Sequence, residues 1–271
     1  MKKTFLLSCL MLAAMPVMAA YTGRVYVDKN KNGVFDPGEK TWAGIKVSDG
    51  LNVVETAADG SFTLPGHERE RFIFITTPSG YKTFNRHYHK IEEKQSGYDF
   101  GLMPYSGRIR KDGSHKYIHI ADTEIFNTEN HEDWVNNVRD YARNEQAAFI
   151  IHTGDICYEK GLKAHIKLMN TENMDCPVFY CIGNHDLVKG KYGEELFESI
   201  YGPVYYSFDA GNVHYVVTPM PGGDHAPGYT SDDVCRWLKN DVAHIRPGTP
   251  VVVFNHDLLT YEDTFIFKSK N

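Results

Sequence analysis

Residues 147–158 read AAFIIHTGDICY, an apolar run that passes directly into a cluster of polar side chains. The run 147–152 has the length of a buried strand and is too short for a buried helix. Gly154 and Asp155 follow this strand at its carboxyl end. In α/β sheets, side chains at the carboxyl ends of neighbouring strands converge on one crevice, where ligands bind. The stretch therefore predicts a layered α/β domain with a functional site at the end of this strand.

Three more apolar runs end in side chains of metal-ligand type. The polar residues are Asp122 and Glu124 after 117–121, Asn184, His185 and Asp186 after 177–182, and His256 after 250–254. Each run is predicted to be a buried strand. We therefore expect all these side chains to meet in one crevice.

The strands around residue 155 alternate with amphipathic helices, which is typical of a layered α/β domain. Predicted helices cover 132–144 and 161–169, and a third begins at Ser231, which we interpret as its cap. A hairpin is predicted at 205–218. The helix-spaced apolar residues are Trp134, Val138 and Tyr141 in the first helix and Val234, Leu238 and Ile245 in the last.

Residues 21–105 have a different pattern, with short alternating strands separated by Gly, Asn, Asp and Pro. Predicted strands cover 22–27, 44–47, 53–56, 61–64 and 71–76, and Asp59-Gly60 is a hairpin turn signal. This pattern predicts a small β-sandwich. The mature chain is thus expected to have a β-sandwich domain at 21–105 and an α/β domain at 106–271.

The loop 28–39, DKNKNGVFDPGE, has the spacing of an EF-hand-type calcium loop. Gly33 stands at loop position 6, where the sharp turn requires it. Oxygen side chains occupy positions 1, 3, 5, 9 and 12, which are Asp28, Asn30, Asn32, Asp36 and Glu39. A strand-like segment precedes the loop, so it is similar to calcium-binding β-sandwich modules of bacterial surface proteins. We expect a structural calcium ion, and the alternative is an Asn/Asp-rich turn without an ion.

The order of the strand-end motifs, with Gly-Asp-X-X-Tyr at 154–158 and Gly-Asn-His-Asp at 183–186, resembles the calcineurin-like metallophosphoesterases over residues 117–260. This resemblance implies an αββα sandwich and two metal ions bridged by Asp155. Asp122 would bind the first ion, and Asn184 and His256 the second. The expected ions are Mn, Fe or Zn, with Mg as an alternative.

In the same resemblance, His185 faces the substrate and donates to the phosphoryl oxygen or the leaving group, and Asp186 orients its imidazole. A bridging carboxylate holds two cations about 3.5–4 Å apart, which lowers the pKa of a shared water and clamps the phosphoryl oxygens. The neutral amide of Asn184 completes a metal shell without repelling an anionic substrate. A His backed by a carboxylate suits proton donation near neutral pH.

Two departures from the family pattern stand out. Glu124 occupies the position of a usual His, where it could ligate and favour Mn, Mg or Fe over Zn, or face away. The usual Gly-His-X-His motif does not follow His256 in residues 257–271. We therefore expect an incomplete αββα sandwich in a truncated product. The alternative function is a catalytically inactive fragment that acts only as a calcium-binding extracytoplasmic module.

The N-terminus predicts a signal peptide over residues 1–20, with Lys2 and Lys3 before an apolar run at 5–17 and small residues after it. The protein is expected to be secreted or periplasmic, and a lipid anchor on Cys9 is a minor alternative. No run reaches the roughly 20 apolar residues that span a bilayer.

The formal net charge of −6 argues against nucleic-acid binding and disfavours a nuclease. The expected partner is a small phosphorylated substrate, such as a sugar phosphate, lipid head group or nucleotide. Sequence leaves the substrate, the choice between monoester and diester, and the oligomeric state open. Two further candidate site features have weaker sequence signals. The Gly/Pro loop 221–229 is interpreted as substrate-facing, and Cys157 as a packed thiol beside the metals. His152 and His214 are predicted to be core histidines or supports of the site.

Overall fold

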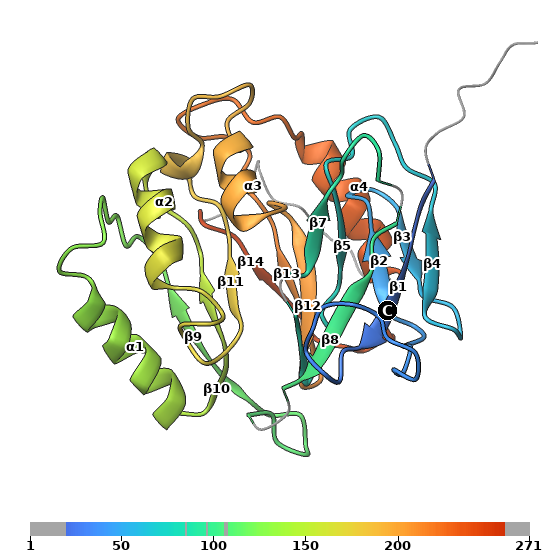
Figure 1. The fold of residues 1–271 in the computed structure, drawn as a ribbon. Helices are drawn as coiled ribbons and strands as arrows, with labels where there is room; N and C mark the ends of the chain where they lie inside the picture. The colour runs from blue at the N-terminus through green and yellow to red at the C-terminus, as the bar shows by residue number, and fades with distance from the viewer. Residues whose placement is uncertain (1–19, 85, 96, 106–107, 258–271) are drawn as a thin grey trace, which may run out of the picture.

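The structure is a computed structural model that describes residues 20–84, 86–95, 97–105 and 108–257. The predicted signal peptide, apart from Ala20, lies outside the described residues, as does the chain after Asp257. A β-rich part precedes a mixed α/β part, and the two lie side by side (Figure 1). The described residues contain no helix that is both long and apolar enough to cross a membrane.

The N-terminal part is a pair of four-stranded sheets with strand orders β4-β1-β8-β6 and β3-β2-β5-β7. The strands are β1 (Tyr21–Val27), β2 (Lys46–Ser48), β3 (Val53–Glu55), β4 (Ser61–Leu64), β5 (Phe72–Ile75), β6 (Tyr81–Thr83), β7 (Tyr88–Lys90) and β8 (Phe100–Pro104). Fully buried residues of both sheets, including Val25 and Val47, share one core. The predicted β-sandwich is confirmed.

The second part has two three-stranded sheets, ordered β11-β10-β9 and β12-β13-β14. The strands are β9 (Lys116–Ile120), β10 (Ala147–His152), β11 (Val178–Tyr180), β12 (Tyr206–Ala210), β13 (Val213–Val217) and β14 (Val251–Phe254). Aromatic side chains fill the space between the sheets, and the rings of Phe179 and Phe208 stack at 3.7 Å. This apolar layer holds the two sheets face to face.

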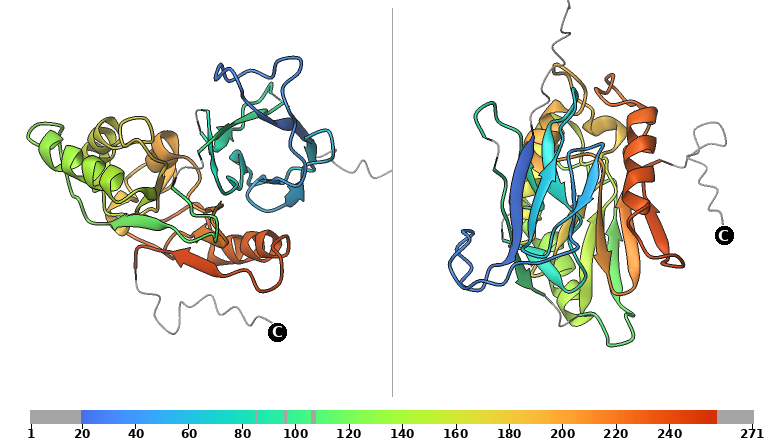
Figure 2. Two further views of the ribbon diagram at one scale, coloured as in Figure 1. Left: turned by 90° about the horizontal axis from the view of Figure 1, so that it is seen from below. Right: turned by 90° about the vertical axis from the view of Figure 1, so that its right-hand side faces the viewer.

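Helices cover both outer sides of this pair of sheets, which gives the predicted αββα layering (Figure 2). The helices are α1 (Glu132–Asn144), α2 (Tyr158–Leu168), α3 (Glu195–Tyr201) and α4 (Ser231–Val242), and a 3-10 turn, η1, spans Asn184–Asp186. Helices α1 and α2 lie on the side of β9–β11, and α4 lies on the opposite side. Strand β10 is buried along its whole length, as its apolar sequence predicts.

Three details of the helix predictions are wrong. Ile245, expected on the last helix, lies beyond the end of α4 at Val242. Tyr141 of α1 is 60 % exposed, and Val135 and Ala142, seven positions apart, are the buried residues instead. The cap of α4 is Thr230, whose Oγ1 accepts the N–H of Asp233 at 3.2 Å while the Asp233 carboxylate accepts the N–H of Thr230 at 3.0 Å. This reciprocal pair satisfies two donors that a cap at Ser231 would leave open.

A buried polar network joins the two parts of the chain. His214 of β13 is fully buried, with Nδ1 2.7 Å from Asp209 and Nε2 2.7 Å from Asp241. Lys46 of β2 reaches the same imidazole, with Nζ 3.4 Å from Nδ1. Because buried charges need partners, this cluster fixes the β-sandwich against the α/β part.

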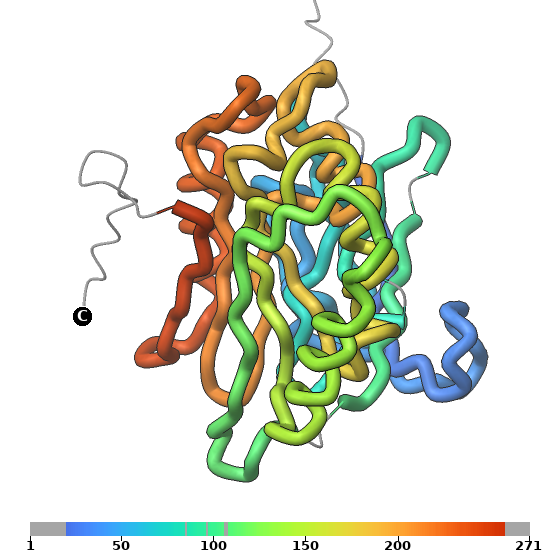
Figure 3. The backbone as a smooth tube through the Cα atoms, turned by 90° about the vertical axis from the view of Figure 1, so that its left-hand side faces the viewer, coloured from blue at the N-terminus to red at the C-terminus, as the bar shows by residue number. Residues whose placement is uncertain are grey.

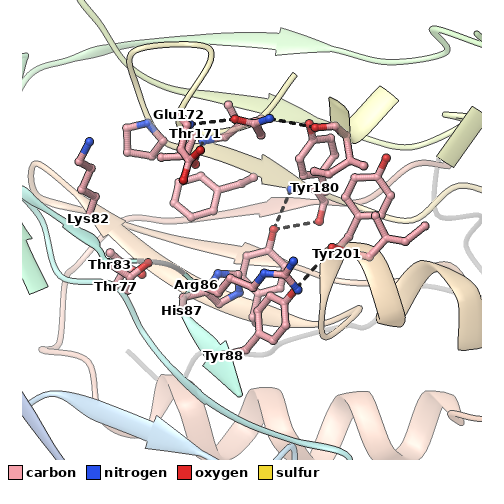
Figure 4. Close-up of a pocket in the computed structure, with 17 residues that line it drawn as sticks. Thr77, Lys82, Thr83, Arg86, His87, Tyr88, Thr171, Glu172, Tyr180 and Tyr201 are labelled. Atoms are coloured by element: carbon pink, nitrogen blue, oxygen red, sulfur yellow. Dashed lines mark hydrogen bonds between the residues drawn. The ribbon is translucent and has the colours of Figure 1, made fainter. Parts of the chain in front are cut away.

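A pocket of about 300 Å³ lies at the same junction, between residues 77–88 and the free edge of β11 (Figure 4). Its tyrosines are engaged in backbone contacts. The Tyr206 hydroxyl accepts the N–H of Tyr180 at 2.9 Å and donates to the Tyr180 carbonyl at 2.8 Å, and Thr171 Oγ1 accepts the N–H of Val178 at 3.1 Å. These side chains replace the neighbouring strand that β11 lacks, so the pocket wall closes a sheet edge.

Candidate metal centre

The strand ends that the sequence singles out come together at one end of the α/β part. Strands β9, β10 and β11 are parallel, as are β13 and β14, so their carboxyl ends point the same way (Figure 3). Asp155 lies at the centre of this end and is only 4 % exposed. Its Oδ1 accepts the backbone N–H of His185 at 3.1 Å. The loops after β10 and β11 are thus joined through the Asp155 carboxylate.

Two glycines allow these loops to touch. A Cβ added at Gly183 would lie 2.2 Å from the backbone N of Asp155, and one added at Gly154 would lie 2.5 Å from the backbone N of Gly183. Gly154 also has a φ of +98°, which only glycine adopts without strain. The Gly-Asp and Gly-Asn pairs of the sequence are therefore steric requirements of the site.

Asp122 and Glu124 follow β9 and reach the same place. The N–H of Asp122 donates to Gly154 O at 3.0 Å, and that of Glu124 donates to Asp155 O at 3.4 Å. Asp122, Glu124 and Asp155 have φ values of 55°, 44° and 53°. Left-handed backbone at a non-glycine residue costs of order 1–3 kcal/mol and is concentrated at functional sites. Three carboxylate residues at these strand ends therefore share a strained backbone conformation.

His256 approaches Asp155 from β14. Its Nε2 lies 3.4 Å from Asp155 Oδ2, and its Nδ1 donates to the Thr153 carbonyl at 2.8 Å. This second contact fixes the tautomer in which Nε2 carries the free lone pair, as in metal-binding histidines. Asn184 begins η1 directly after Gly183 and is half-buried.

Two groups of three potential ligands form at these strand ends, each with its ligand atoms within 4.8 Å of one another. One group is Asp122, Asp155 and His256, and the other is Glu124, Asp155 and Cys157. Asp155 belongs to both groups. A shared carboxylate between two adjacent ligand sets fits a pair of bridged divalent cations. The grouping differs from the sequence assignment, since it brings Asp122 to His256 and leaves Glu124 beside Cys157.

His185 lies at the open rim of this centre, with 35 % of its side chain exposed. Nδ1 is 2.8 Å from Oδ2 of Asp224, and Nε2 is 4.0 Å from Oδ2 of Asp155. The hydrogen bond to Asp224 raises the pKa of His185, with partial burial acting against it and the Asp155 charge adding to it. The protonated imidazole is therefore favoured beside the carboxylate of Asp155.

The structure corrects the prediction that Asp186 orients His185. Asp186 is fully buried, and its two oxygens accept the backbone N–H groups of Cys157 at 2.8 Å and Gly183 at 2.9 Å. Burial raises the pKa of this carboxyl to about 6, against the lowering effect of the backbone N–H groups. Asp186 therefore ties the β10 loop to the β11 loop, and Asp224 takes the place beside the imidazole.

Asp224 is the site residue that sequence reasoning missed. Its loop was predicted to face the substrate, but no strand-end pattern marks the residue. Gly223 lets this loop approach, because a Cβ there would lie 2.7 Å from Asn184 O, and the N–H of Asp224 donates to that oxygen at 3.1 Å. The Gly-Gly-Asp run at 222–224 was the available signal.

His152 supports the centre through two hydrogen bonds to the surrounding loops. It is fully buried; its Nδ1 accepts the N–H of Gly154 at 3.1 Å, so its Nε2 donates to Thr123 Oγ1 at 3.0 Å. Burial holds the pKa of His152 well below the ordinary value. The neutral imidazole links the loops that carry Asp122 and Asp155.

Two family models match the chain. Residues 115–266 match the model described as calcineurin-like phosphoesterase, and residues 29–105 match the model described as the N terminal of calcineurin-like phosphoesterase. The chain belongs to the calcineurin-like phosphoesterase family. No curated protein matches it. Calcineurin-like phosphoesterases are hydrolases that use divalent metals, and the oxygen-rich ligand groups of this member fit such ions.

The predicted calcium loop lies between β1 and β2. Asp28 is 1 % exposed, and its oxygens accept the N–H groups of Asn32 at 3.2 Å and Gly33 at 2.8 Å. Asp36 Oδ2 accepts the amides of Asn30 at 2.7 Å and Asn32 at 2.8 Å. The Glu39 carboxylate, at position 12, accepts the N–H groups of Lys29 and Asp36 at 2.8 and 3.0 Å.

Among the five predicted calcium ligands, Asn30 and Asn32 thus bind the Asp36 carboxylate side chain to side chain, while Asp28 and Glu39 bind backbone N–H groups of the loop. In this arrangement the Asn30 and Asn32 amides point their nitrogens at Asp36. Calcium binding requires these amides to present oxygen instead. Within the described part of the chain, neither group of three close metal-ligand side chains includes a residue of this loop.

Proposed function

We propose that this protein hydrolyses a phosphomonoester or phosphodiester at the centre formed by Asp122, Asp155 and His256, together with Glu124 and Asn184. The observation that carries the proposal is the position of Asp155, which is common to both ligand groups. Two divalent ions held there would lower the pKa of a water and neutralise the charge of a phosphoryl group. The expected ions are Mn, Fe or Zn, and Mg is the harder alternative.

His185 is assigned to the proton transfer. Its exposed Nε2 edge faces the centre, while Asp224 holds Nδ1 and keeps the ring in one orientation. An imidazolium so placed can donate a proton to the departing alkoxide or hydrogen-bond a phosphoryl oxygen. Asp224 thus supports donation by fixing the ring and favouring its charged form.

The substrate is proposed to be a small phosphorylated molecule outside the cytoplasm. The expected signal peptide supports a secreted or periplasmic location. An overall charge of −6 disfavours a nucleic-acid backbone as substrate, so we assign the attraction of an anionic substrate to the metals and to His185. The proposal covers both phosphomonoesters and phosphodiesters as substrates.

The test compares hydrolysis of p-nitrophenyl phosphate and bis-p-nitrophenyl phosphate with added manganese. Asp155→Ala is expected to abolish hydrolysis and metal retention together, because it removes the ligand common to both groups. Asp140→Ala is the matched control, since Asp140 is a 54 % exposed carboxylate that pairs with Arg139 and Arg143 on the surface of α1. Undiminished turnover by Asp155→Ala contradicts the assignment.

We also propose that loop 28–39 binds a structural calcium ion. The near-complete burial of Asp28 supports this, because the N–H groups of Asn32 and Gly33 hydrogen-bond its carboxylate but do not neutralise the buried charge, as a calcium ion would. Millimolar calcium is expected to stabilise the chelator-treated protein by about 1–3 kcal/mol, as an extracellular site of weak affinity would. Asp28→Asn should remove this response, and Asp59→Asn, at an exposed hairpin turn, should retain it. An unchanged melting temperature in the unsubstituted protein excludes the site.

Metal analysis separates the catalytic proposal from a non-catalytic calcium module. After dialysis, two tightly held transition metals per chain support the phosphoesterase. Calcium alone supports the inactive module.

A further inference from the structure

Cys157 stands at the metal centre as well as in the core. It lies two residues after Asp155 and is the residue from which α2 begins. Its Sγ, an oxygen of Glu124 and an oxygen of Asp155 all lie within 4.8 Å of one another. Three atoms at this spacing can reach a common ion, because metal–ligand distances of about 2.0–2.3 Å place two ligands of one ion up to twice that far apart.

In the part of the chain that the structure describes, the Cys157 thiol lacks a hydrogen-bond partner. The side chain of Cys157 is 1 % exposed, and within the described ranges no hydrogen bond to its Sγ is found. Cys181 is equally buried, and its Sγ donates to the carbonyl of Thr218 at 3.3 Å. Cys157 is thus an unpartnered polar atom, buried among carboxylates rather than among apolar side chains alone.

We propose that Cys157 is a thiolate ligand of one of the two metal ions, together with Glu124 and the bridging Asp155. On binding, the S–H proton leaves to water and a sulfur–metal bond forms, with no change of oxidation state. The inference rests on the proposed function, because it concerns the ions of the same centre. It replaces the interpretation of Cys157 as a packed thiol.

The consequence is metal selectivity. Glu124 alone, in a position without imidazole, favours hard cations such as Mn or Mg. A thiolate beside it favours borderline ions, such as Zn, Fe²⁺ or Co²⁺, and disfavours Mg. The two sides of Asp155 then differ, with oxygen and nitrogen ligands at Asp122 and His256 and oxygen and sulfur ligands at Glu124 and Cys157.

Cobalt loading tests the assignment with a readout independent of catalysis. A thiolate bound to Co²⁺ gives a charge-transfer band in the near ultraviolet that oxygen and nitrogen ligands do not give. The band is expected in the unsubstituted protein and in Cys181→Ser, and it should be lost in Cys157→Ser. Cys181→Ser is the matched control because it removes another fully buried thiol close to β11.

Zinc affinity gives a second measure. Loss of the sulfur ligand in Cys157→Ser should weaken the affinity for the zinc ion on the Glu124 side. The decrease should exceed the roughly 10- to 100-fold that loss of an outer hydrogen-bond partner costs. If Cys157→Ser does not fold, X-ray absorption of the zinc-loaded unsubstituted protein decides. One sulfur at about 2.3 Å from zinc supports the proposal, and a shell of oxygen and nitrogen alone overturns it.

Cobalt content and hydrolysis, measured on the same samples, keep the two proposals apart. Two bound Co²⁺ ions with turnover but no charge-transfer band overturn the role of Cys157 and leave the phosphoesterase standing. A band that persists in Cys157→Ser also overturns the role. If the unsubstituted protein binds no cobalt, both proposals fail.

Discussion

His185 and Asp224 are joined side chain to side chain, with Nδ1 and Oδ2 2.8 Å apart across 39 positions of sequence. The contact is reinforced by the backbone, because the N–H of Asp224 donates to the carbonyl of Asn184 at 3.1 Å. The 221–225 loop is thereby attached to η1 at two points. This attachment leaves Nε2 of His185 as the nitrogen that faces Asp155.

Substitution of Asp224 by Asn should lower kcat while leaving metal content unchanged. His185→Ala removes the proton donor, which typically contributes about 10²- to 10⁴-fold. Asp224→Asn keeps the imidazole and should lower kcat by less, because it only loosens the orientation of the ring and makes its protonated form less favourable. In both variants the decrease in kcat should be larger for phenyl phosphate than for p-nitrophenyl phosphate, because the poorer leaving group depends more on protonation. Equal losses on both substrates argue against proton donation by His185.

The same pair predicts a pH dependence. Because the hydrogen bond to Asp224 raises the pKa of His185, the protonated donor persists to higher pH with Asp224 present than without it. Activity that needs the acid form is lost as pH rises through this pKa. In Asp224→Asn the pKa should fall, so the alkaline limb of the kcat profile should move to lower pH. A limb that stays in place shows that another group sets it.

The positions of the polar side chains at the strand ends could be predicted because their signal is local. A buried run such as 147–152 followed by Gly154 and Asp155 specifies both a strand and the residue that leaves its end. The pairing of His185 is not local. Asp186 is its sequence neighbour, yet η1 turns that carboxylate inward to the N–H groups of Cys157 and Gly183.

Helix α3 shows a second limit of the sequence. It spans only seven residues, too few for its apolar residues to establish a helical period, and its buried residues include Glu198. Glu194 and Glu198 both bind Arg71 of the β-sandwich, at 2.9 and 3.1 Å. The helix is stabilised by a partner from a distant segment, which periodicity cannot reveal. The prediction for Tyr141 of α1 is wrong for the opposite reason, because its spacing fits the apolar face of the helix but its side chain is exposed.

Removal of His214 should destabilise the protein strongly. Its two ring nitrogens both lie 2.7 Å from carboxylates, so both must carry protons to donate. His214→Ala would leave the buried Asp241 without its cationic partner, which typically costs about 3–5 kcal/mol. Urea denaturation should show this loss. His244→Ala is the control, because its ion pair with Glu55 is exposed and should contribute under about 1 kcal/mol.

The His214 network also makes stability depend on pH. Burial opposes the charged imidazole, but the hydrogen bonds to Asp209 and Asp241 outweigh it and raise the pKa of His214. A raised folded-state pKa contributes stability fully below the unfolded value of about 6.5, and the contribution is lost as pH rises through the folded value. The gap in unfolding free energy between the unsubstituted protein and His214→Ala should therefore narrow above neutral pH. A gap that widens with pH contradicts the imidazolium assignment.

Tyr206→Phe should cost more stability than its size suggests. The lost hydroxyl is the partner of both the N–H and the carbonyl of Tyr180 at the free edge of β11, and all these groups are buried. An unsatisfied buried donor costs about 1–3 kcal/mol, so the unfolding free energy of Tyr206→Phe should fall by about that amount. Tyr201→Phe is the matched control: its hydroxyl donates to Leu162 O, a carbonyl within α2 that keeps its helical partner, so about 1 kcal/mol should be lost. Urea denaturation of the two variants at the same pH measures the difference. Equal losses would mean that water or a backbone shift satisfies the edge of β11 when the Tyr206 hydroxyl is absent.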